Sequence, residues 1–425
     1  MTYSPYVGTL PELMSGHSSP DSGSAPVLPN AADVLGFDPF DPGFMRDPYT
    51  RYRELRARGP LVRTRAGLLV ATTYELCSAL LRDPRFGHGT VQPEGEDEAA
   101  HSFLVLDPPD HTRLRGLVSR AFTPRMVERL RPRVEAIAAG LIADLPDETD
   151  LLDRFAYPLP VMVITEMLGV PVEDHERFRT WSGDLAGGLD PVLTQARAAR
   201  AERARAELGA YVRGLVAVRR ERPGDDLLSA LTRVEELTEA ELVATCVLLL
   251  VAGHETTVNL IANGVLNLAG RGLLRHAAER PRQVVEEVLR YDPPVQLTSR
   301  TALTDADLGG TPVPAGTPVL GLIGAANRDP AVFDEPDRFD VGREPGRHLA
   351  FGLGVHFCLG ATLARMEGEI ALAALAATAP KLELAEAEPP YRGNIVLRGL
   401  ARLPVRLGRR RPGTPPALDG GTSVA

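Results

Sequence analysis

Apolar residues recur every three or four positions along most of the chain, a spacing that places them on one face of an α-helix. The strongest helix signal begins at "TEAE", where Thr238 and Glu241 form a capping box before a long apolar run. The predicted helices span Pro48–Arg58, Tyr74–Leu81, His111–Arg120, Pro124–Ile142, Pro160–Leu168, Val192–Arg222, Glu239–Leu268, Pro281–Tyr291 and Ala361–Thr378. The predicted strands span Leu61–Arg63, Leu68–Ala71, Thr298–Ala302, Thr317–Leu320 and Asn394–Val396.

This pattern predicts a mainly α protein of the α+β class. Turn signals such as "DLGGTPVPAGTP" suit a small antiparallel β region. The two ends of the chain, 1–30 and 408–425, are rich in Pro, Gly and Ser and are expected to be disordered. No Pro- or Gly-rich linker divides the chain between them, so we expect one folded domain over residues 31–407.

Charge and cysteine content narrow the function classes. The 425 residues carry a net charge of −9, which argues against a protein that binds nucleic acid through a basic face. The cysteines, Cys77, Cys246 and Cys358, are far apart and form no CxxC, which fits a reducing cytosol. The chain begins without a signal-like segment, and its most apolar run, Leu242–Gly253, is short for a membrane span. We therefore expect a cytoplasmic protein without a membrane anchor.

Polar residues interrupt the longest predicted helix in "AGHETT", Ala252–Thr257. Gly253 costs about 1 kcal/mol inside a helix, and a buried carboxylate such as Glu255 costs more unless it is paired or neutralised. A helix that passes near the surface with a polar face is one interpretation. The other is a local widening beside a ligand, with Glu255 and Thr256 placed to pass protons.

Two further helical segments carry charged residues about one turn apart. Glu287 and Arg290 of "EEVLR" fit a salt bridge, and an exposed pair is the commoner case. His111 and Arg115 of "DPPDHTRLR" share one helical face, where they could hold an anion, although a solvated face is the more frequent explanation. Neither segment assigns a function by itself.

The segment "FGLGVHFCLG", Phe351–Gly360, surrounds Cys358 with glycine and aromatic residues. As a nucleophile, Cys358 would need a base, and His356 has no adjacent acid to orient it. As a metal ligand it would be a thiolate, and a sole soft ligand suits a metal whose other positions are filled, of which haem iron is the leading case. A buried structural cysteine is the usual alternative, but the density of special residues here favours the metal ligand.

Taken together, these motifs resemble those of the cytochrome P450 family. "FGLGVHFCLG" looks like the family's cysteine loop, "AGHETT" like the oxygen-binding segment of its long central helix, "EEVLR" like its Glu-x-x-Arg pair and "EPDRFD" like the meander that follows. The likeness runs from about Phe37 to Arg406, with the motifs in the family's order. It implies a single triangular, mainly helical fold with a long central helix over the haem, which agrees with the hydrophobic pattern.

The resemblance also implies roles for individual residues. Cys358 would be the iron ligand of haem b, and Glu255 with Thr256 the catalytic pair that passes protons. Glu287 and Arg290 would form a buried structural triad with Arg338 of "EPDRFD". The residues implied around the haem are His111, Arg115, Ala252, Gly253, Arg300, His348, Phe351, Gly352, His356 and Gly360. The residues implied at the substrate are Leu248, Val295, Leu297 and Ile395. They belong to a pocket that the resemblance builds from Gly87–Val105, Asp184–Leu193, Leu248–Ala252, Val295–Thr298 and Asn394–Val396.

Reaction and partners follow from the same resemblance. Family members of this kind insert one oxygen atom from O2 into an apolar substrate, with electrons that pass from NAD(P)H through a ferredoxin reductase and a ferredoxin. The ferredoxin is expected to dock over the cysteine side of a monomer. A basic patch is expected there from Arg113, Arg120, Arg347 and Arg365.

The substrate is the least determined part of the interpretation. The overall pattern is similar to actinobacterial enzymes that modify macrolides and other polyketides, so we expect hydroxylation or epoxidation of such a molecule in antibiotic biosynthesis. A terpenoid, a steroid, a fatty acid or a carrier-bound peptide is the alternative substrate. A haem-thiolate sensor or non-catalytic partner protein is the alternative of another class, and the retained cysteine and acid–alcohol pair argue against it.

Overall fold

The computed structural model describes residues 31–89, 101–191 and 194–408, so the predicted disordered ends lie outside the described residues apart from Gly408. The helices are α2 (Ala31–Leu35), α3 (Pro42–Arg46), α4 (Pro48–Arg58), α5 (Tyr74–Arg82), α6 (Asp110–Ala121), α7 (Pro124–Ala143), α8 (Pro158–Leu168), α9 (His175–Gly187), α10 (Gln195–Glu221), α11 (Leu227–Leu231), α12 (Glu239–Ala269), α13 (His276–Glu279), α14 (Pro281–Tyr291), α15 (Ile323–Ala326) and α16 (Ala361–Thr378). The strands are β1 (Leu61–Arg63), β2 (Leu69–Ala71), β3 (Phe86–Gly87), β4 (Glu148–Asp150), β5 (Thr298–Ala302), β6 (Ala306–Leu308), β7 (Thr311–Val313), β8 (Pro318–Gly321), β9 (Glu383–Leu384) and β10 (Pro404–Arg406). The mainly helical prediction is confirmed.

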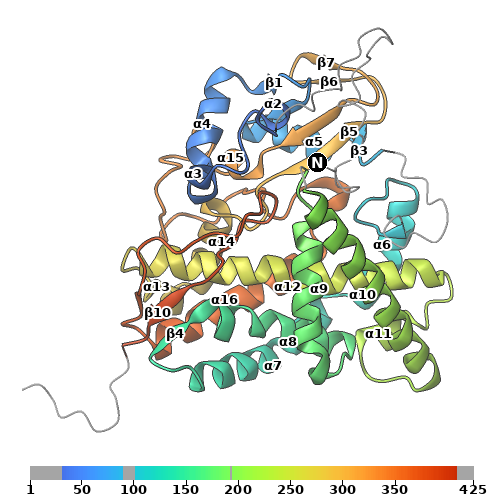
Figure 1. Cartoon of the computed structure of the whole chain (residues 1–425), viewed down its shortest axis with the longest axis vertical. Coiled ribbons are helices and arrows are strands. Elements are labelled where there is room, and N and C mark those ends of the chain that lie inside the picture. Colours follow the sequence, from blue (N-terminus) through green and yellow to red (C-terminus); the bar gives the residue numbers. More distant parts are fainter. Residues whose placement is uncertain (1–30, 90–100, 192–193, 409–425) are drawn as a thin grey trace, which may run out of the picture.

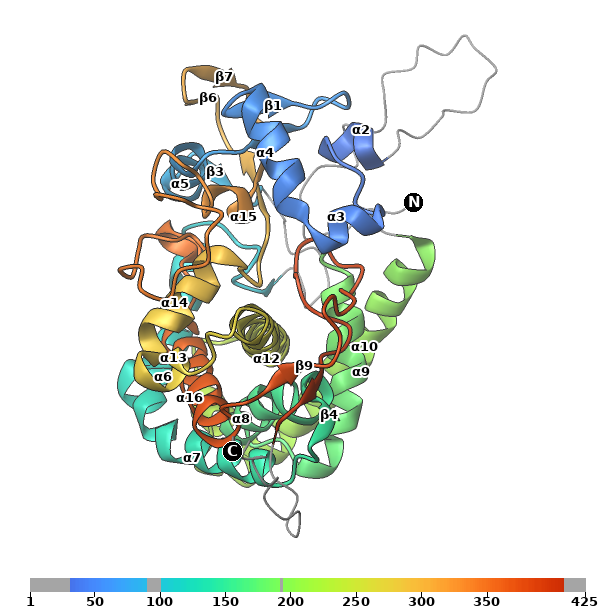
Figure 2. The same cartoon turned by 90° about the vertical axis from the view of Figure 1, so that its left-hand side faces the viewer.

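Helix α12 runs through the middle of the molecule (Figure 1), and Figure 2 looks along it with other helices around it. Its start is fixed by the predicted capping box, in which the Glu241 N–H donates to Thr238 Oγ1 at 3.2 Å and the Thr238 N–H donates to Glu241 Oε2 at 3.0 Å. The helix packs against α8, α9, α10, α14 and α16. It is long and apolar enough to cross a membrane, but 61% of its most apolar window is buried inside the fold, as expected for a core helix.

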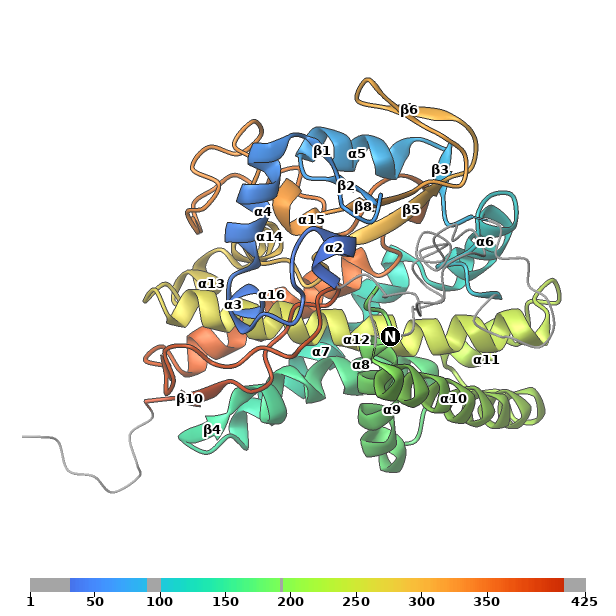
Figure 3. The same cartoon turned by 45° about the horizontal axis from the view of Figure 1, so that its top comes forward.

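The larger sheet lies to one side of α12 with α4 and α5 (Figure 3). Its strand order is β1-β2-β8-β5-β3. The pairings are antiparallel except that β2 and β8 run parallel, so this sheet is mixed where an antiparallel region was predicted. The sheet matters for the site because β5 carries Arg300, which pairs in register with Val319 of β8.

Most predicted elements appear with ends shifted by a few residues, although the predicted helix start at Val192 lies outside the described residues. The elements that were not predicted are α2, α3, α9, α11, α13, α15 and the short strands β3, β4, β6, β7, β9 and β10. Asn394–Val396 is not a strand, and it belongs to a turn whose nearest ladder contact is the isolated bridge between Val295 and Leu397. The main core is formed by α7, α8, α12, α14 and α16, and Figure 1 shows α7, α8 and α16 on the side of α12 that faces away from the sheet. Residues of α12 and of β5 line the same cavity, which is described below.

Candidate active site

The cysteine loop, residues 351–360, turns tightly before α16. Gly352 and Gly354 have φ of 67° and 69°, a left-handed conformation that glycine adopts without strain. A Cβ on Gly354 would also lie 2.3 Å from the carbonyl oxygen of Leu81. The loop closes where the Cys358 N–H donates to the Phe351 carbonyl at 2.9 Å. Cys358, Phe351, Gly352 and Gly360 thereby line a cavity of about 330 Å³.

The Cys358 thiol lies in a mixed electrostatic environment. Burial raises its pKa, whereas the Gly360 backbone N–H and the guanidiniums of Arg115 and Arg365 act to lower it. No group of three or more His, Cys, Asp or Glu within the described residues could hold a metal ion. A metal bound at Cys358 must therefore bring its other ligands with it, and coordination would deprotonate the thiol.

Two arginines from different elements reach the same cavity. Arg115 on α6 donates to the carbonyl oxygen of Phe357. Arg300 on β5 is buried and donates to Thr298 Oγ1 at 3.2 Å and to the Ser299 carbonyl at 2.7 Å. Burial is the largest influence on both guanidiniums and lowers both pKa values, that of Arg300 to about 10. Two cations at one cavity with no ion pair to a described carboxylate create a site for an anionic ligand.

Three histidines accompany these arginines. The ring of His356 lies 4.1 Å from the ring of His111 and 4.7 Å from that of His88. Burial, with the nearby arginines, lowers the pKa of His88 to about 3, of His111 to about 4 and of His356 to about 2, so all three are neutral near pH 7. Both ring nitrogens of His111 and Nε2 of His356 are buried without a hydrogen-bond partner among the described residues. Such orphaned polar atoms call for a ligand that completes their hydrogen bonds.

These residues fit a haem. Cys358 would ligate the iron, and the Gly360 N–H would temper the charge on its sulfur. Arg115 and Arg300 match the two negative charges of the haem propionates, and the orphaned nitrogens of His111 and His356 would bond the propionate oxygens. The apolar remainder of the cavity wall, from Leu248 to Leu363, suits the flat face of the macrocycle.

A second cavity of about 290 Å³ adjoins the first and is lined mainly by apolar side chains. Leu248, Ala252, Thr256 and Val295 line both cavities, and Leu297 lines the second. Apolar walls with few polar groups are typical of sites for large apolar molecules. The lining of the second cavity therefore suits a large apolar molecule.

Segment Ala252–Thr257 faces both cavities from α12. The helix is continuous here, so the local widening that the sequence suggested is not seen. The Thr256 hydroxyl donates to the Ala252 carbonyl at 3.0 Å, one turn earlier. Gly253 permits close approach of α8, because a Cβ there would lie 2.9 Å from Cδ1 of Ile164. The Glu255 carboxylate is buried at the wall of the second cavity, so the pair combines a hydroxyl and an acid where the cavities meet.

Comparisons with known proteins decide the family. The cytochrome P450 family model matches residues 281–377. Cytochrome P450 monooxygenase PikC of Streptomyces venezuelae is 44% identical over 413 residues, covering 91% of this chain and 96% of the relative. The chain belongs to the cytochrome P450 family. The 6-deoxyerythronolide B hydroxylase of Saccharopolyspora erythraea is 39% identical, covering 86% of this chain and 97% of the relative. The crystal structure of Mycobacterium smegmatis CYP164A2 has a TM-score of 0.81 at 45% identity, covering 87% of this chain and 98% of that one.

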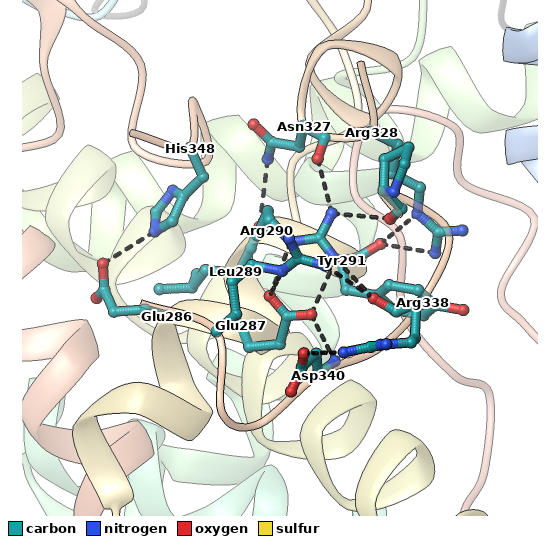
Figure 4. Close-up of polar contacts among 12 residues, drawn as sticks. Glu286, Glu287, Leu289, Arg290, Tyr291, Asn327, Arg328, Arg338, Asp340 and His348 are labelled. Carbon is teal, nitrogen blue, oxygen red and sulfur yellow. Dashed lines mark hydrogen bonds and ion pairs between the residues drawn. The ribbon is translucent and has the colours of Figure 1, made fainter. Parts of the chain in front are cut away.

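As a P450, the chain is a haem-thiolate monooxygenase with a P450 fold, which confirms the resemblance on which the sequence interpretation rested. Figure 4 shows the ion pair of α14 among the polar contacts that join it to Asn327, Arg338 and Asp340. Arg290 donates to Glu287 through Nε at 2.7 Å and Nη2 at 2.8 Å, and both side chains are almost fully buried. The Glu287–Arg290 pair is thus internal, not the exposed pair that its spacing alone favoured.

Arg338 is not the third member of this cluster. Its side chain is 57% exposed and pairs with Glu335 and Asp340, while its backbone carbonyl accepts from Arg290. The second arginine beside Glu287, after Arg290, is Arg343. Its Nε lies 3.3 Å from Glu287 Oε2, and its side chain is 17% exposed. The turn of the meander brings position 343 inward and leaves position 338 facing solvent.

Two other predicted site residues also lie elsewhere. His348 lines neither cavity, because its Nε2 lies 3.1 Å from Glu286 Oε2 and its ring packs beside Phe351. Ile395 packs into the smaller core cluster with Leu297, whereas its neighbours Val396 and Leu397 line the second cavity. His348 therefore supports α14, and the substrate wall is shifted by one to two residues along the C-terminal segment.

Two residues of the site were not predicted: Arg343, and Arg392, whose Nη1 lies 3.0 Å from Glu255 Oε2. His88 was expected only as part of the pocket loop Gly87–Val105 and was not named by itself. His88 follows β3 in a turn whose N–H groups donate to the Asp107 carboxylate at 2.9–3.0 Å, and its ring lines both cavities. Its position between two glycines in "FGHG" was the available signal. Arg343 and Arg392 sit in irregular segments where no periodicity marks an inward-facing residue.

Proposed function

We propose that this P450 hydroxylates or epoxidises a macrolide or a related polyketide, with haem b as its cofactor and electrons supplied from NAD(P)H by a ferredoxin and a separate reductase. The observation that carries the proposal is the acid–alcohol pair Glu255–Thr256 at the junction of the two cavities, with Cys358 lining the first of them. The apolar second cavity supports a large apolar substrate. Similarity to relatives named as PikC and as a 6-deoxyerythronolide B hydroxylase supports the polyketide class.

The chain's own residues would prepare the reaction. Bound haem with a thiolate ligand supplies O2 reduction and O–O cleavage. Thr256 would turn its hydroxyl hydrogen from the Ala252 carbonyl towards the haem side of α12, since Thr256 lines both cavities. The Glu255 carboxylate would take up a proton from solvent and pass it to Thr256, so that each proton leaving the Thr256 hydroxyl is replaced. Positioned proton transfer of this kind typically contributes about 10²- to 10⁴-fold in rate.

The expected ferredoxin-docking surface is the outer side of the cysteine loop. Val355 and Phe357 are 54% and 41% exposed there, which is unusual for apolar side chains of this size. Two of the four arginines expected in a basic patch have acidic partners, because Arg113 pairs with Glu241 and Arg365 with Glu286. The docking contact would therefore combine an apolar centre with Arg120 and Arg347, which are exposed.

Two measurements test the proposal. The pyridine haemochrome spectrum and the CO difference spectrum of the reduced protein should identify haem b with a thiolate ligand. A panel of macrolactones and macrolides, including 6-deoxyerythronolide B, should contain molecules that convert the haem from low to high spin and that yield a monooxygenated product with ferredoxin and reductase. A shift with fatty acids or steroids but not with any polyketide would contradict the assigned substrate class.

A further inference from the structure

The carboxylate of Glu255 is held by a residue far along the chain. Arg392 Nη1 lies 3.0 Å from Glu255 Oε2, and Arg392 Nη2 donates to Asn259 Oδ1 at 2.6 Å, one helical turn further along α12. The Glu255 side chain is 3% exposed and that of Arg392 is 32% exposed. Arg392 thus spans from a surface-accessible turn to a buried acid.

Arg392 supplies the positive charge for this acid. His254 Nε2 lies 3.8 Å from Glu255 Oε1, but burial lowers the pKa of His254, which is therefore neutral. That ring is engaged with the Leu250 carbonyl and the Ser182 hydroxyl. The other nearby titratable group, Tyr157, has its pKa raised by burial and by Glu255. Among the described contacts of Glu255, the ion pair with Arg392 is the one that compensates burial of its charge.

The segment that carries Arg392 is also part of the substrate-cavity wall. We call residues 392–397 the C-terminal turn. Val396 and Leu397 line the second cavity, and the Gln296 N–H donates to the Val396 carbonyl at 2.9 Å. A substrate that presses on this wall therefore presses on the segment that positions the Arg392 guanidinium.

The C-terminal turn is also fastened to the cover formed by α9 and α10. Asp190 Oδ1, in the segment between these helices, accepts from the Ile395 and Val396 N–H groups at 3.0 Å each. Arg197 Nη1 on α10 donates to the Gly393 carbonyl at 2.8 Å, and Asn394 Nδ2 donates to the Ala186 carbonyl at 3.2 Å. Leu185 and Leu189 from the same cover line the second cavity.

We infer that Arg392 is a positioning residue that couples closure of the substrate cavity to proton delivery by Glu255. With the cover closed on the C-terminal turn, Arg392 holds the Glu255 carboxylate in a fixed position at the cavity wall. When the cover moves away, the turn loses the Asp190 and Arg197 contacts and Arg392 loses its fixed position. The inference rests on the proposed relay and adds that the relay is complete only in the closed protein.

The test uses the haem-loaded protein with ferredoxin, reductase and 6-deoxyerythronolide B, or the panel macrolide with the largest spin shift. Arg392→Gln should lower the product formed per NADPH, here called the coupling, about 10-fold. This loss is smaller than the roughly 10²- to 10⁴-fold contribution of a positioned proton transfer, because the acid itself is retained. The same substitution should raise the solvent deuterium isotope effect. The substrate Kd from the spin shift should change less than about twofold, because Arg392 does not line the cavity. Arg392→Lys should recover most of the coupling.

A matched control and a second variant keep the inference falsifiable. Arg402→Gln removes an exposed arginine that pairs with Glu386 at 3.0 Å and should leave every value unchanged. Asp190→Ala frees the C-terminal turn without touching Glu255, and its effect on coupling should not add to that of Arg392→Gln. Equal coupling in Arg392→Gln and Arg402→Gln overturns the inference, as does full additivity. If Arg392→Gln does not retain haem, the Asp190→Ala variant provides the test, and normal product per NADPH in that variant overturns the inference.

Failure of this inference is distinguishable from failure of the proposed function. Unchanged coupling in Thr256→Ala would show that the relay itself is wrong. If Thr256→Ala loses coupling while Arg392→Gln and Asp190→Ala keep normal coupling, the relay stands and the positioning role of Arg392 is refuted. Absence of any spin shift across the macrolide panel would count only against the substrate class.

Discussion

Replacement of Glu287 by Ala should destabilise the protein and release its haem. Glu287 accepts two hydrogen bonds from Arg290 and a third from the Asp340 N–H at 2.8 Å, and it lies 3.3 Å from Arg343 Nε. The substitution leaves two guanidiniums with less than one-fifth of their side chains exposed and no carboxylate between them. Removing one partner of a buried pair costs about 3–5 kcal/mol. That is a large share of a typical unfolding free energy of about 5–15 kcal/mol.

Loss of haem follows from a short path of hydrogen bonds. Arg290 Nη1 donates to the Asn327 carbonyl at 3.0 Å, and Asn327 Oδ1 accepts from the Leu349 N–H at 2.7 Å. Leu349 lines the haem cavity and precedes Phe351 by two residues. A displaced Arg290 therefore disturbs the start of the cysteine loop. The haem-to-protein absorbance ratio after purification and urea unfolding followed by circular dichroism measure the two effects.

Two controls separate the members of the cluster. Arg338→Ala removes only exposed ion pairs and should cost at most about 1 kcal/mol with normal haem content. Arg343→Ala removes the inward cation and should fall between Arg338→Ala and Glu287→Ala. A Glu287→Ala protein with wild-type haem content and stability would refute the structural role of the pair. Greater damage from Arg338→Ala than from Arg343→Ala would refute the reassigned third member.

Three further predictions concern the relay, pH and the partner. Thr256→Ala should keep haem and substrate binding but lower product per NADPH about 10-fold or more and release hydrogen peroxide, measured by a peroxidase-coupled assay. Glu367 on α16 is fully buried and burial raises its pKa well above the ordinary value, so the folded chain keeps a proton that the unfolded chain loses above about pH 4.3. Stability contributed by this proton is complete below that pH and falls as pH rises, by up to about 1.4 kcal/mol per pH unit; Glu367→Gln should flatten the decline in urea titrations between about pH 5 and about pH 8, and an unchanged slope would exclude Glu367 as its source. Phe357→Ser should slow reduction by ferredoxin at low and high salt alike, because an apolar contact is not screened by salt. Arg120→Gln and Arg347→Gln should slow reduction mainly at low salt. Stopped-flow reduction rates equal to the wild-type rate in all three variants would contradict the docking surface.

The sequence predicted those parts of the fold that regular periodicity determines. The capping box at Thr238 and the helical pattern of α12 and α14 were sufficient to place Thr256 and Glu287 on helices, because a residue's face on a helix follows from its spacing. The cysteine loop could also be predicted, since its glycines and its cysteine form a local sequence motif. In segments without hydrophobic periodicity, the sequence did not show which side chains point inward.

Arg338 and Arg343 illustrate the limit. Both lie in an irregular meander, and which one turns inward depends on backbone hydrogen bonds such as those from Arg290 to the carbonyls of Pro336 and Arg338. These bonds form only after α14 and the meander have packed. Ile395 was misplaced for a similar reason, since the direction of its side chain is set by the two N–H bonds to Asp190 from a segment about 200 residues earlier.

The polar groups of the site differ in whether their hydrogen-bond or charge partner comes from the protein or from a bound ligand. His111 and His356 keep buried ring nitrogens without a partner among the described residues, and Arg115 and Arg300 have no ion pair to a described carboxylate, which favours an anionic ligand there. Glu255 is the opposite case, because Arg392 already satisfies it within the chain. A cofactor site can be built from unsatisfied donors, since the cofactor stays bound. For the proposed relay acid the partner cation belongs to the protein itself, and it lies on the segment that also forms part of the second cavity's wall.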